Sequence, residues 1–417
     1  MLDRATAILL SFAAASLAVS GAQVVAAAPD QQKFSQIERG RYLTTLADCV
    51  ACHTNPGTGK RFAGGRPIET PFGIVVSANI TPDTKTGIGG WSDEQFDNAV
   101  RHGVRADGKR LYPAMPYPSY AKMSHEDVLA IRAYLATIPP VHNEVVSDQL
   151  PFPLNIRAGM RLWNALYFND AEFQTNPDKP PQWNRGAYLV NGPGHCGACH
   201  TPKTMLGGDK LSQALRGGQV QGWLAPNITN DKAKGLGSWS KDDIVDFLKS
   251  GHSRVATVTG PMAEEIEHSS SRWTQADLQA IATYLKDLPG IQAKGSPVAA
   301  NDPAMKAGQA IYRDVCSACH QLDGKGVPHL FPSLPDSAAV RADDATTAIR
   351  VVLRGARSVA TSPEPTAPGM PSFAWQLKDD QVAAVLTYIR NSWGVAAPAV
   401  SADTVATERS NLAARTD

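Results

Sequence analysis

Apolar residues recur at helical spacing in three segments of closely similar sequence. In the first segment, Val128, Ile131 and Leu135 fall at positions i, i+3 and i+7, so they share one face of a helix. The pattern predicts three helices, each with one buried face. The three segments are residues 127–135, 277–285 and 381–389.

Polar residues with capping spacing stand ahead of several predicted helices. Ser124 and Thr274 each precede an aspartate by three residues, at the start of the first two segments. Ser92 and Ser240 open two further predicted helices with the same spacing to a glutamine or an aspartate. These serines and threonines predict helix N-termini.

Other short pieces also repeat, which predicts a chain built from copies of one module. Residues 40–43 recur as 186–189, and residues 79–81 recur as 227–229. A third, shorter copy has a related sequence at residues 308–312. We expect each module to begin with a helix that contains the first of these repeated pieces. Each module then ends with one of the three helices predicted above.

A C-x-x-C-H motif follows the first predicted helix of every module. This motif attaches a c-type haem: the two sulfurs form thioethers and the histidine binds the iron. A zinc half-site and a redox dithiol are the alternatives, but three copies that each keep the histidine favour haem. The attachment residues are Cys49, Cys52, His53, Cys196, Cys199, His200, Cys316, Cys319 and His320.

A methionine stands before the last helix of each module, in a predicted loop that contains proline or glycine. Met115 and Met262 both lie 62 residues after the motif histidine, and Met370 lies 50 residues after it. Met123 is a rival in the first module, but its spacing has no counterpart elsewhere. Histidine and methionine together saturate the iron, which is the ligation of electron carriers. We therefore predict His53, Met115, His200, Met262, His320 and Met370 as iron ligands.

Composition and the absence of certain motifs exclude several other classes of function. The chain has 417 residues and a net charge of +1, which gives no basic excess for a nucleic-acid partner. All six cysteines belong to the haem motifs, so no thiol is left for a disulfide. No dinucleotide fingerprint, nucleophile elbow or phosphate loop is present, so we expect no separate active site.

The N-terminus has the layout of a secretory signal peptide. Residues 1–28 hold an arginine, an apolar run and a small-residue end, with cleavage expected near Ala27 or Ala28. An uncleaved membrane anchor is the alternative, although alanine and serine make the run weakly hydrophobic. Export to the periplasm agrees with covalent haem attachment.

Each module resembles the class I cytochrome c fold, so we expect an all-α protein of three tandem domains. In that fold the first and last helices cross at a glycine and an aromatic residue, here Gly40 with Tyr134, Gly186 with Tyr284, and Gly308 with Tyr388. The polar tail, residues 396–417, is expected to be disordered. The expected domains are residues 33–145, 184–290 and 303–395, with a connector at 146–183 that contains a short amphipathic helix.

The whole arrangement resembles the triheme cytochrome c subunit of membrane-associated bacterial dehydrogenases. Those complexes include alcohol, gluconate, fructose, sorbitol and aldehyde dehydrogenases. The most specific pieces are residues 111–117, 183–190, 194–202 and 225–229. The resemblance implies a catalytic partner with a flavin, quinone or molybdenum cofactor, and a quinone or a terminal oxidase as acceptor.

Two other functions remain open at this point. A catalytic multihaem enzyme, such as a peroxidase or a sulfur-compound oxidase, needs an iron without a strong sixth ligand. A free-standing electron carrier would have no dedicated catalytic partner. The spectrum of the oxidised haems tests the first alternative, and co-purification tests the second.

Overall fold

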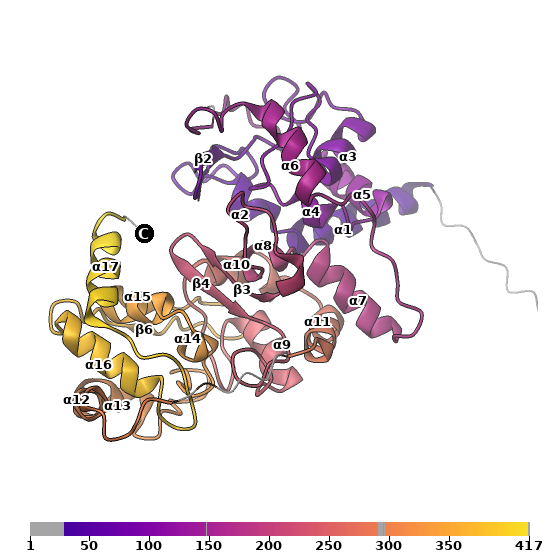
Figure 1. Cartoon of the computed structure of the whole chain (residues 1–417). Helices are drawn as coiled ribbons and strands as arrows, with labels where there is room; N and C mark the ends of the chain where they lie inside the picture. The colour runs from indigo at the N-terminus through magenta and orange to yellow at the C-terminus, as the bar shows by residue number, and fades with distance from the viewer. Residues whose placement is uncertain (1–28, 147, 291–294, 296, 416–417) are drawn as a thin grey trace, which may run out of the picture.

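The chain forms three mostly helical units in contact with one another (Figure 1). This computed structural model describes residues 29–146, 148–290, 295 and 297–415. The predicted signal peptide, residues 1–28, lies outside the described residues. The all-α prediction is confirmed, although the described residues also contain short antiparallel hairpins.

The first unit begins with α1 (Pro29–Leu46) and ends with α5 (His125–Leu135), and these two helices pack on each other. A hairpin pairs Pro67 with Val76 and Thr70 with Gly73. Between the outer helices come α2 (Cys49–His53), β1 (Pro67–Thr70), β2 (Gly73–Val76), α3 (Asp93–His102) and α4 (Tyr117–Tyr120).

A connector with η1 (Arg157–Gly159) and α6 (Met160–Tyr167) leads to the second unit, whose outer helices are α7 (Pro181–Asn191) and α11 (Gln275–Asp287). The predicted connector helix is therefore present. It packs on the first domain, where Tyr117 donates to Asn164 Oδ1 at 2.6 Å. The remaining elements are α8 (Gly197–His200), η2 (Leu211–Gln213), β3 (Arg216–Val220), β4 (Trp223–Asn227), α9 (Lys241–Ser250), α10 (Pro261–His268) and η3 (Ser270–Arg272).

The third unit repeats the plan with α12 (Pro303–Ile311) and α16 (Asp379–Ile389) as its outer helices. A stretch of π-helix, η4 (Tyr312–Cys316), leads into its cysteine motif. The other elements are α13 (Ser317–His320), α14 (Ala338–Arg341), α15 (Thr346–Arg354), β5 (Ala356–Arg357), β6 (Gly369–Met370) and α17 (Ala402–Ala413).

The predicted caps are confirmed. Ser92 Oγ accepts from Gln95 N at 3.1 Å, and the glutamine side chain accepts from Ser92 N at 2.9 Å. Ser240 forms the same reciprocal box at the start of α9. Ser124 and Thr274 each accept from a backbone amide three residues on. Caps of this kind contribute about 1 kcal/mol each.

The outer helices cross at a glycine, which has no side chain to hold the two backbones apart. A Cβ on Gly186 would lie 2.0 Å from the carbonyl oxygen of Ala280 and 2.9 Å from Cβ of Tyr284. The predicted glycine–tyrosine contact is therefore present at this crossing. The equivalent glycines of the other units, which meet the backbone of their last helices in the same way, are Gly40 and Gly308.

Replacing Gly186 by alanine is expected to destabilise the second domain by about 3 kcal/mol, because the added methyl group must push two backbones apart. Thermal unfolding of the haem-loaded protein measures the effect. Gly159→Ala is the matched control, since no atom lies within 4 Å of its added Cβ. Equal unfolding temperatures for the two variants would contradict the tight crossing.

The prediction of a disordered tail is wrong. Residues 402–413 form α17, which packs on α15 and α16. Val405 and Leu412 are buried in the third domain, and Arg409 Nε donates to Asp379 at 2.7 Å. Only two apolar residues of the helix face the domain, so the sequence looked too polar to fold.

The first two domains share one hydrophobic core and exchange hydrogen bonds symmetrically. Tyr42 of α1 donates to Asp277 of the second domain at 2.8 Å, and Tyr188 of α7 donates to Asp127 of the first. Each aspartate is also bound by an arginine of its own domain. These arginines are Arg39 and Arg185, at 2.7 and 2.8 Å. The two domains therefore meet as two equivalent halves.

Acid is expected to weaken this domain contact. Burial alone would raise the pKa of Asp277, but Arg185 and the Tyr42 hydroxyl outweigh it and hold the pKa below its usual value. A carboxylate with a lowered pKa contributes stability above its usual pKa and loses that contribution as the pH falls through the lowered value. Asp277→Asn should cost about 1.5–3 kcal/mol at pH 7, and this cost should shrink as the pH falls through the lowered pKa. Unfolding temperatures across that range test this, and Lys241→Met is a control on the same domain.

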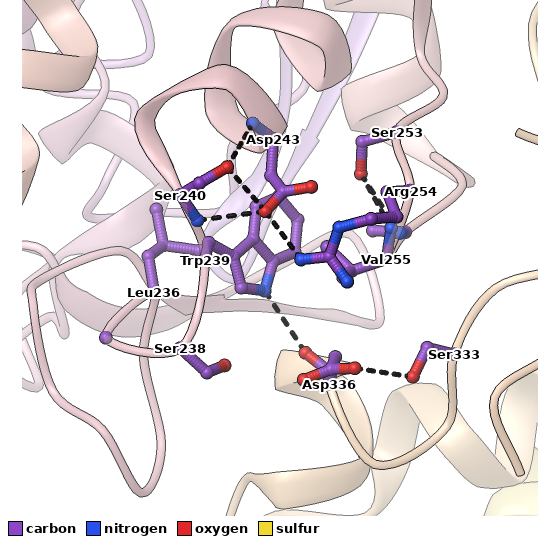
Figure 2. Close-up of polar contacts among 12 residues, drawn as sticks. Leu236, Ser238, Trp239, Ser240, Asp243, Ser253, Arg254, Val255, Ser333 and Asp336 are labelled. Atoms are coloured by element: carbon purple, nitrogen blue, oxygen red, sulfur yellow. Dashed lines mark hydrogen bonds and ion pairs between the residues drawn. The ribbon is translucent and has the colours of Figure 1, made fainter. Parts of the chain in front are cut away.

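The second and third domains meet through several polar contacts. Figure 2 shows Trp239, beside the capped turn of α9, with its Nε1 donating to the carbonyl oxygen of Asp336 at 3.2 Å. Ser333 steadies Asp336 through a 2.7 Å hydrogen bond and also donates its amide to Val255. Strand β4 contacts α14 and α15 of the third domain. The second domain therefore contacts both of the others.

Candidate haem-binding sites

Each cysteine motif lies on a short helical turn that follows the first helix of its domain. Cys49 and Cys52 both belong to α2, where residues three apart lie on the same face. The equivalent turns are α8 and α13, and each ends at the motif histidine. Two thiols on one face can reach the two vinyl groups of one haem. The histidine that follows them can bind the iron of the same haem.

The three motif histidines share one feature that fixes their tautomer. In each, the ring Nδ1 faces a backbone carbonyl oxygen, which can only accept a hydrogen bond. Nδ1 therefore carries the proton and Nε2 keeps its lone pair for a metal. The pairs are His53 with Ala78 at 2.6 Å, His200 with Pro226 at 2.7 Å and His320 with Pro332 at 3.2 Å.

Burial tunes these groups toward haem rather than thiolate chemistry. It lowers the pKa of His53, His200 and His320, so the imidazoles are neutral at neutral pH and able to bind iron. Burial also raises the pKa of the Cys49 and Cys196 thiols to about 12. A reactive dithiol needs a lowered thiol pKa, so these surroundings do not favour redox dithiol chemistry.

The candidate methionines lie in three different local structures. Met115 is in a turn before α4 and packs against the shared core of the first two domains. Met262 is in the first turn of α10, directly after Pro261, and not in a loop as the sequence suggested. Met370 is in β6, where it pairs with Ala356 of β5. All three are partly buried and contact apolar residues.

The rival methionine of the first domain has a packing role. Met123 is fully buried in the shared core. Met160 and Met305 are also buried, whereas Met205 is 96% exposed. The assignment of Met115, Met262 and Met370 as iron ligands stays a prediction.

A family comparison decides the class of the protein. Residues 37–139, 184–289 and 305–393 match the family model of cytochrome c. The chain belongs to the cytochrome c family. In this cytochrome c, the three C-x-x-C-H motifs bind three haem c groups covalently. The neutral histidines with a free Nε2 fit that cofactor.

Three relatives cover nearly the whole of this cytochrome c. The gluconate 2-dehydrogenase cytochrome c subunit of Pantoea cypripedii is 40% identical, over 92% of each chain. The fructose dehydrogenase cytochrome subunit of Gluconobacter japonicus is 39% identical, over 92% of this chain and 85% of its own. The cytochrome c subunit of the quinone alcohol dehydrogenase of Gluconacetobacter polyoxogenes is 38% identical, over 93% and 87%.

The carbonyl partners of the histidines escaped the sequence analysis, although a signal for two of them existed. Ala78 and Pro226 each stand directly before the repeated Asn-Ile-Thr. In the second domain, Asn227 Oδ1 accepts from Thr229 N at 2.8 Å and so fixes the turn that presents the Pro226 carbonyl. The repeat therefore marks the support of the histidine and not the iron ligand itself.

Other histidines of this cytochrome c have structural partners. His252 is fully buried at the contact between the second and third domains, where its ring meets the carbonyl of His329 and the hydroxyl of Ser358. His195 precedes Cys196 and packs edge-on against Tyr120 of the first domain. Both residues join domains.

Proposed function

We propose that this cytochrome c is the electron-transfer subunit of a periplasmic dehydrogenase complex. It takes electrons from a catalytic subunit that carries a flavin, quinone or molybdenum cofactor, and it passes them to a quinone or a terminal oxidase. Haem c supplies a one-electron iron couple when bound. The protein contributes the ligands, the surroundings and the spacing between domains.

The observation that carries this proposal is the repeated ligand pair. Each domain offers a neutral histidine with a free Nε2 and a methionine in the segment before its last helix. Two protein ligands leave no open position for a substrate, so each iron is suited to carry electrons. The near full-length similarity to dehydrogenase cytochrome subunits supports a dehydrogenase as the electron donor.

The place of action follows from the predicted signal peptide. The predicted signal peptide favours the periplasm, which agrees with haem attachment outside the cytoplasmic membrane. None of the described helices is long and apolar enough to span a bilayer. We propose a peripheral position on the outer face of the cytoplasmic membrane, reached through the catalytic partner.

Purification of the native complex from membranes of the source organism tests the proposal. A larger cofactor-bearing subunit should co-purify, and one of ethanol, gluconate, fructose, sorbitol or acetaldehyde should reduce the haems. Carbon monoxide should leave the spectrum of the reduced protein unchanged, because every iron is saturated. Purification of the cytochrome without such a partner, or carbon monoxide binding in the wild type, would contradict the proposal.

A further inference from the structure

Arg66 lies beside the haem attachment turn of the first domain. Its Nη1 donates to the carbonyl oxygen of Ala51, inside α2, at 2.6 Å. Its backbone pairs with Ser77, the residue before Ala78, whose carbonyl binds His53. The guanidinium is therefore held against the same turn that carries the first haem.

The partner of this arginine comes from the other domain. Glu264 belongs to α10 of the second domain and accepts two hydrogen bonds from Arg66, one of them from Nη2 at 2.9 Å. We call this bidentate ion pair the Arg66–Glu264 clasp. Glu264 stands two residues after Met262, so the clasp joins the first haem turn to the helix with the second methionine.

A second contact supports the same arrangement. Helix α10 lies against α2, and Ser269, which follows α10, donates to the carbonyl oxygen of Thr45 at 2.6 Å. The arginine and glutamate side chains are 23% and 35% exposed, so water screens their charges only in part. The hydrogen bond to Glu264 raises the pKa of Arg66, which keeps the guanidinium charged.

The clasp lies at the haem attachment point. The Ala51 carbonyl that accepts from Arg66 belongs to the residue directly before Cys52, which attaches the first haem. A cation and an anion at this place act on the charge of the iron with opposite signs.

We propose that the two charges of the Arg66–Glu264 clasp act on the reduction potential of the first haem with opposite signs, so that Glu264, a positioning residue supplied by the second domain, offsets the effect of Arg66. The inference rests on haem c attached at Cys49 and Cys52. It does not depend on the identity of the dehydrogenase partner.

The sign of each effect follows from electrostatics. Reduction adds an electron, so a nearby cation favours the ferrous state and a nearby anion opposes it. In Arg66→Met the cation is lost and the potential falls. In Glu264→Gln the anion is lost, Arg66 is no longer compensated, and the potential rises. A loss of packing would instead move both variants in the same direction.

Optical redox titration of the haem-loaded full chain tests the proposal. At a fixed applied potential, Arg66→Met should lower the ferrous-to-ferric ratio of one haem about tenfold. This change corresponds to a fall of ~59 mV in the reduction potential of a one-electron couple. Glu264→Gln should raise it by a similar factor. The double variant and Arg66→Lys should stay near the wild type, because both keep the net charge of the clasp. The component that moves should be the one missing from a Cys49→Ala, Cys52→Ala double variant.

Asp287→Asn serves as the control, because it breaks the 2.6 Å ion pair between Asp287 of the second domain and Lys179 of the connector. It should move none of the three components. Haem content is measured first, so that a missing haem is not taken for a shifted one. Shifts of the same sign in Arg66→Met and Glu264→Gln, or no shift in either one of them, would overturn the proposal. Glu264→Gln keeps the shape of the side chain and so remains informative if the arginine variant does not fold.

Discussion

Replacing both Cys196 and Cys199 by alanine is expected to lower the covalent haem content from three to two per chain. Without thioethers, the haem of the second domain is held only by its axial ligands and is lost on denaturing extraction. Haem spectra in alkaline pyridine measure the content.

Single substitutions give the matched controls for this experiment. Cys196→Ala keeps one thioether and should retain a haem that resists extraction. Thermal unfolding should show a destabilised second domain in the double variant, since the thioethers no longer fix the haem to the chain. Three haems that resist extraction from the double variant would contradict the assignment of Cys196 and Cys199 as haem attachment residues.

Replacing Met262 by alanine should keep three haems but open one iron. Loss of the thioether sulfur lowers the potential of that haem by on the order of 0.1 V or more, given the ~0.8 V range that axial ligands set. The methionine–iron absorption band should lose one third of its intensity, and carbon monoxide should now bind one haem per chain. Redox titration and carbon monoxide difference spectra measure these effects.

Met123→Leu is the control for the methionine assignment. Met123 is fully buried in the shared core, so this conservative change should alter stability by less than about 1.5 kcal/mol and leave all three potentials unchanged. Carbon monoxide binding in Met123→Leu, or none in Met262→Ala, would reverse the roles given to these residues.

The elements that the sequence predicted well are those with a local physical cause. The final helices have apolar residues at helical spacing, and Ser124 and Thr274 cap them through a bond to a backbone amide three residues away. The cysteine motifs need only one helical turn. Such features depend on neighbours in the chain, which the sequence displays directly.

Features that depend on distant partners were missed. The strands of each hairpin are at most five residues long, too short for a clear alternation of apolar and polar residues. Helix α17 has few apolar residues and is stabilised by docking, for example through Arg409 with Asp379. The carbonyls that bind His53, His200 and His320 belong to the backbone and have no residue type of their own.

The contacts between domains were also beyond the sequence. Tyr42 and Tyr188 were recognised as parts of a repeat, but nothing showed that each would bond to an aspartate of the other domain. Arg66 and Glu264 are almost two hundred positions apart, and only folding brings them together. The haem attachment motifs could therefore be predicted, whereas the groups that join the haem domains could not.

The exchanged tyrosine–aspartate bonds between the first two domains have an evolutionary consequence. Two identical chains that met through this contact would form a symmetric dimer, in which every substitution appears on both sides of the axis. Fusion into one chain removes that constraint, since Asp127 and Asp277 are then inherited as separate positions. Each half can change its own haem surroundings while the paired contact is kept. Arg66 and Glu264 join the two halves through a single pair of residues.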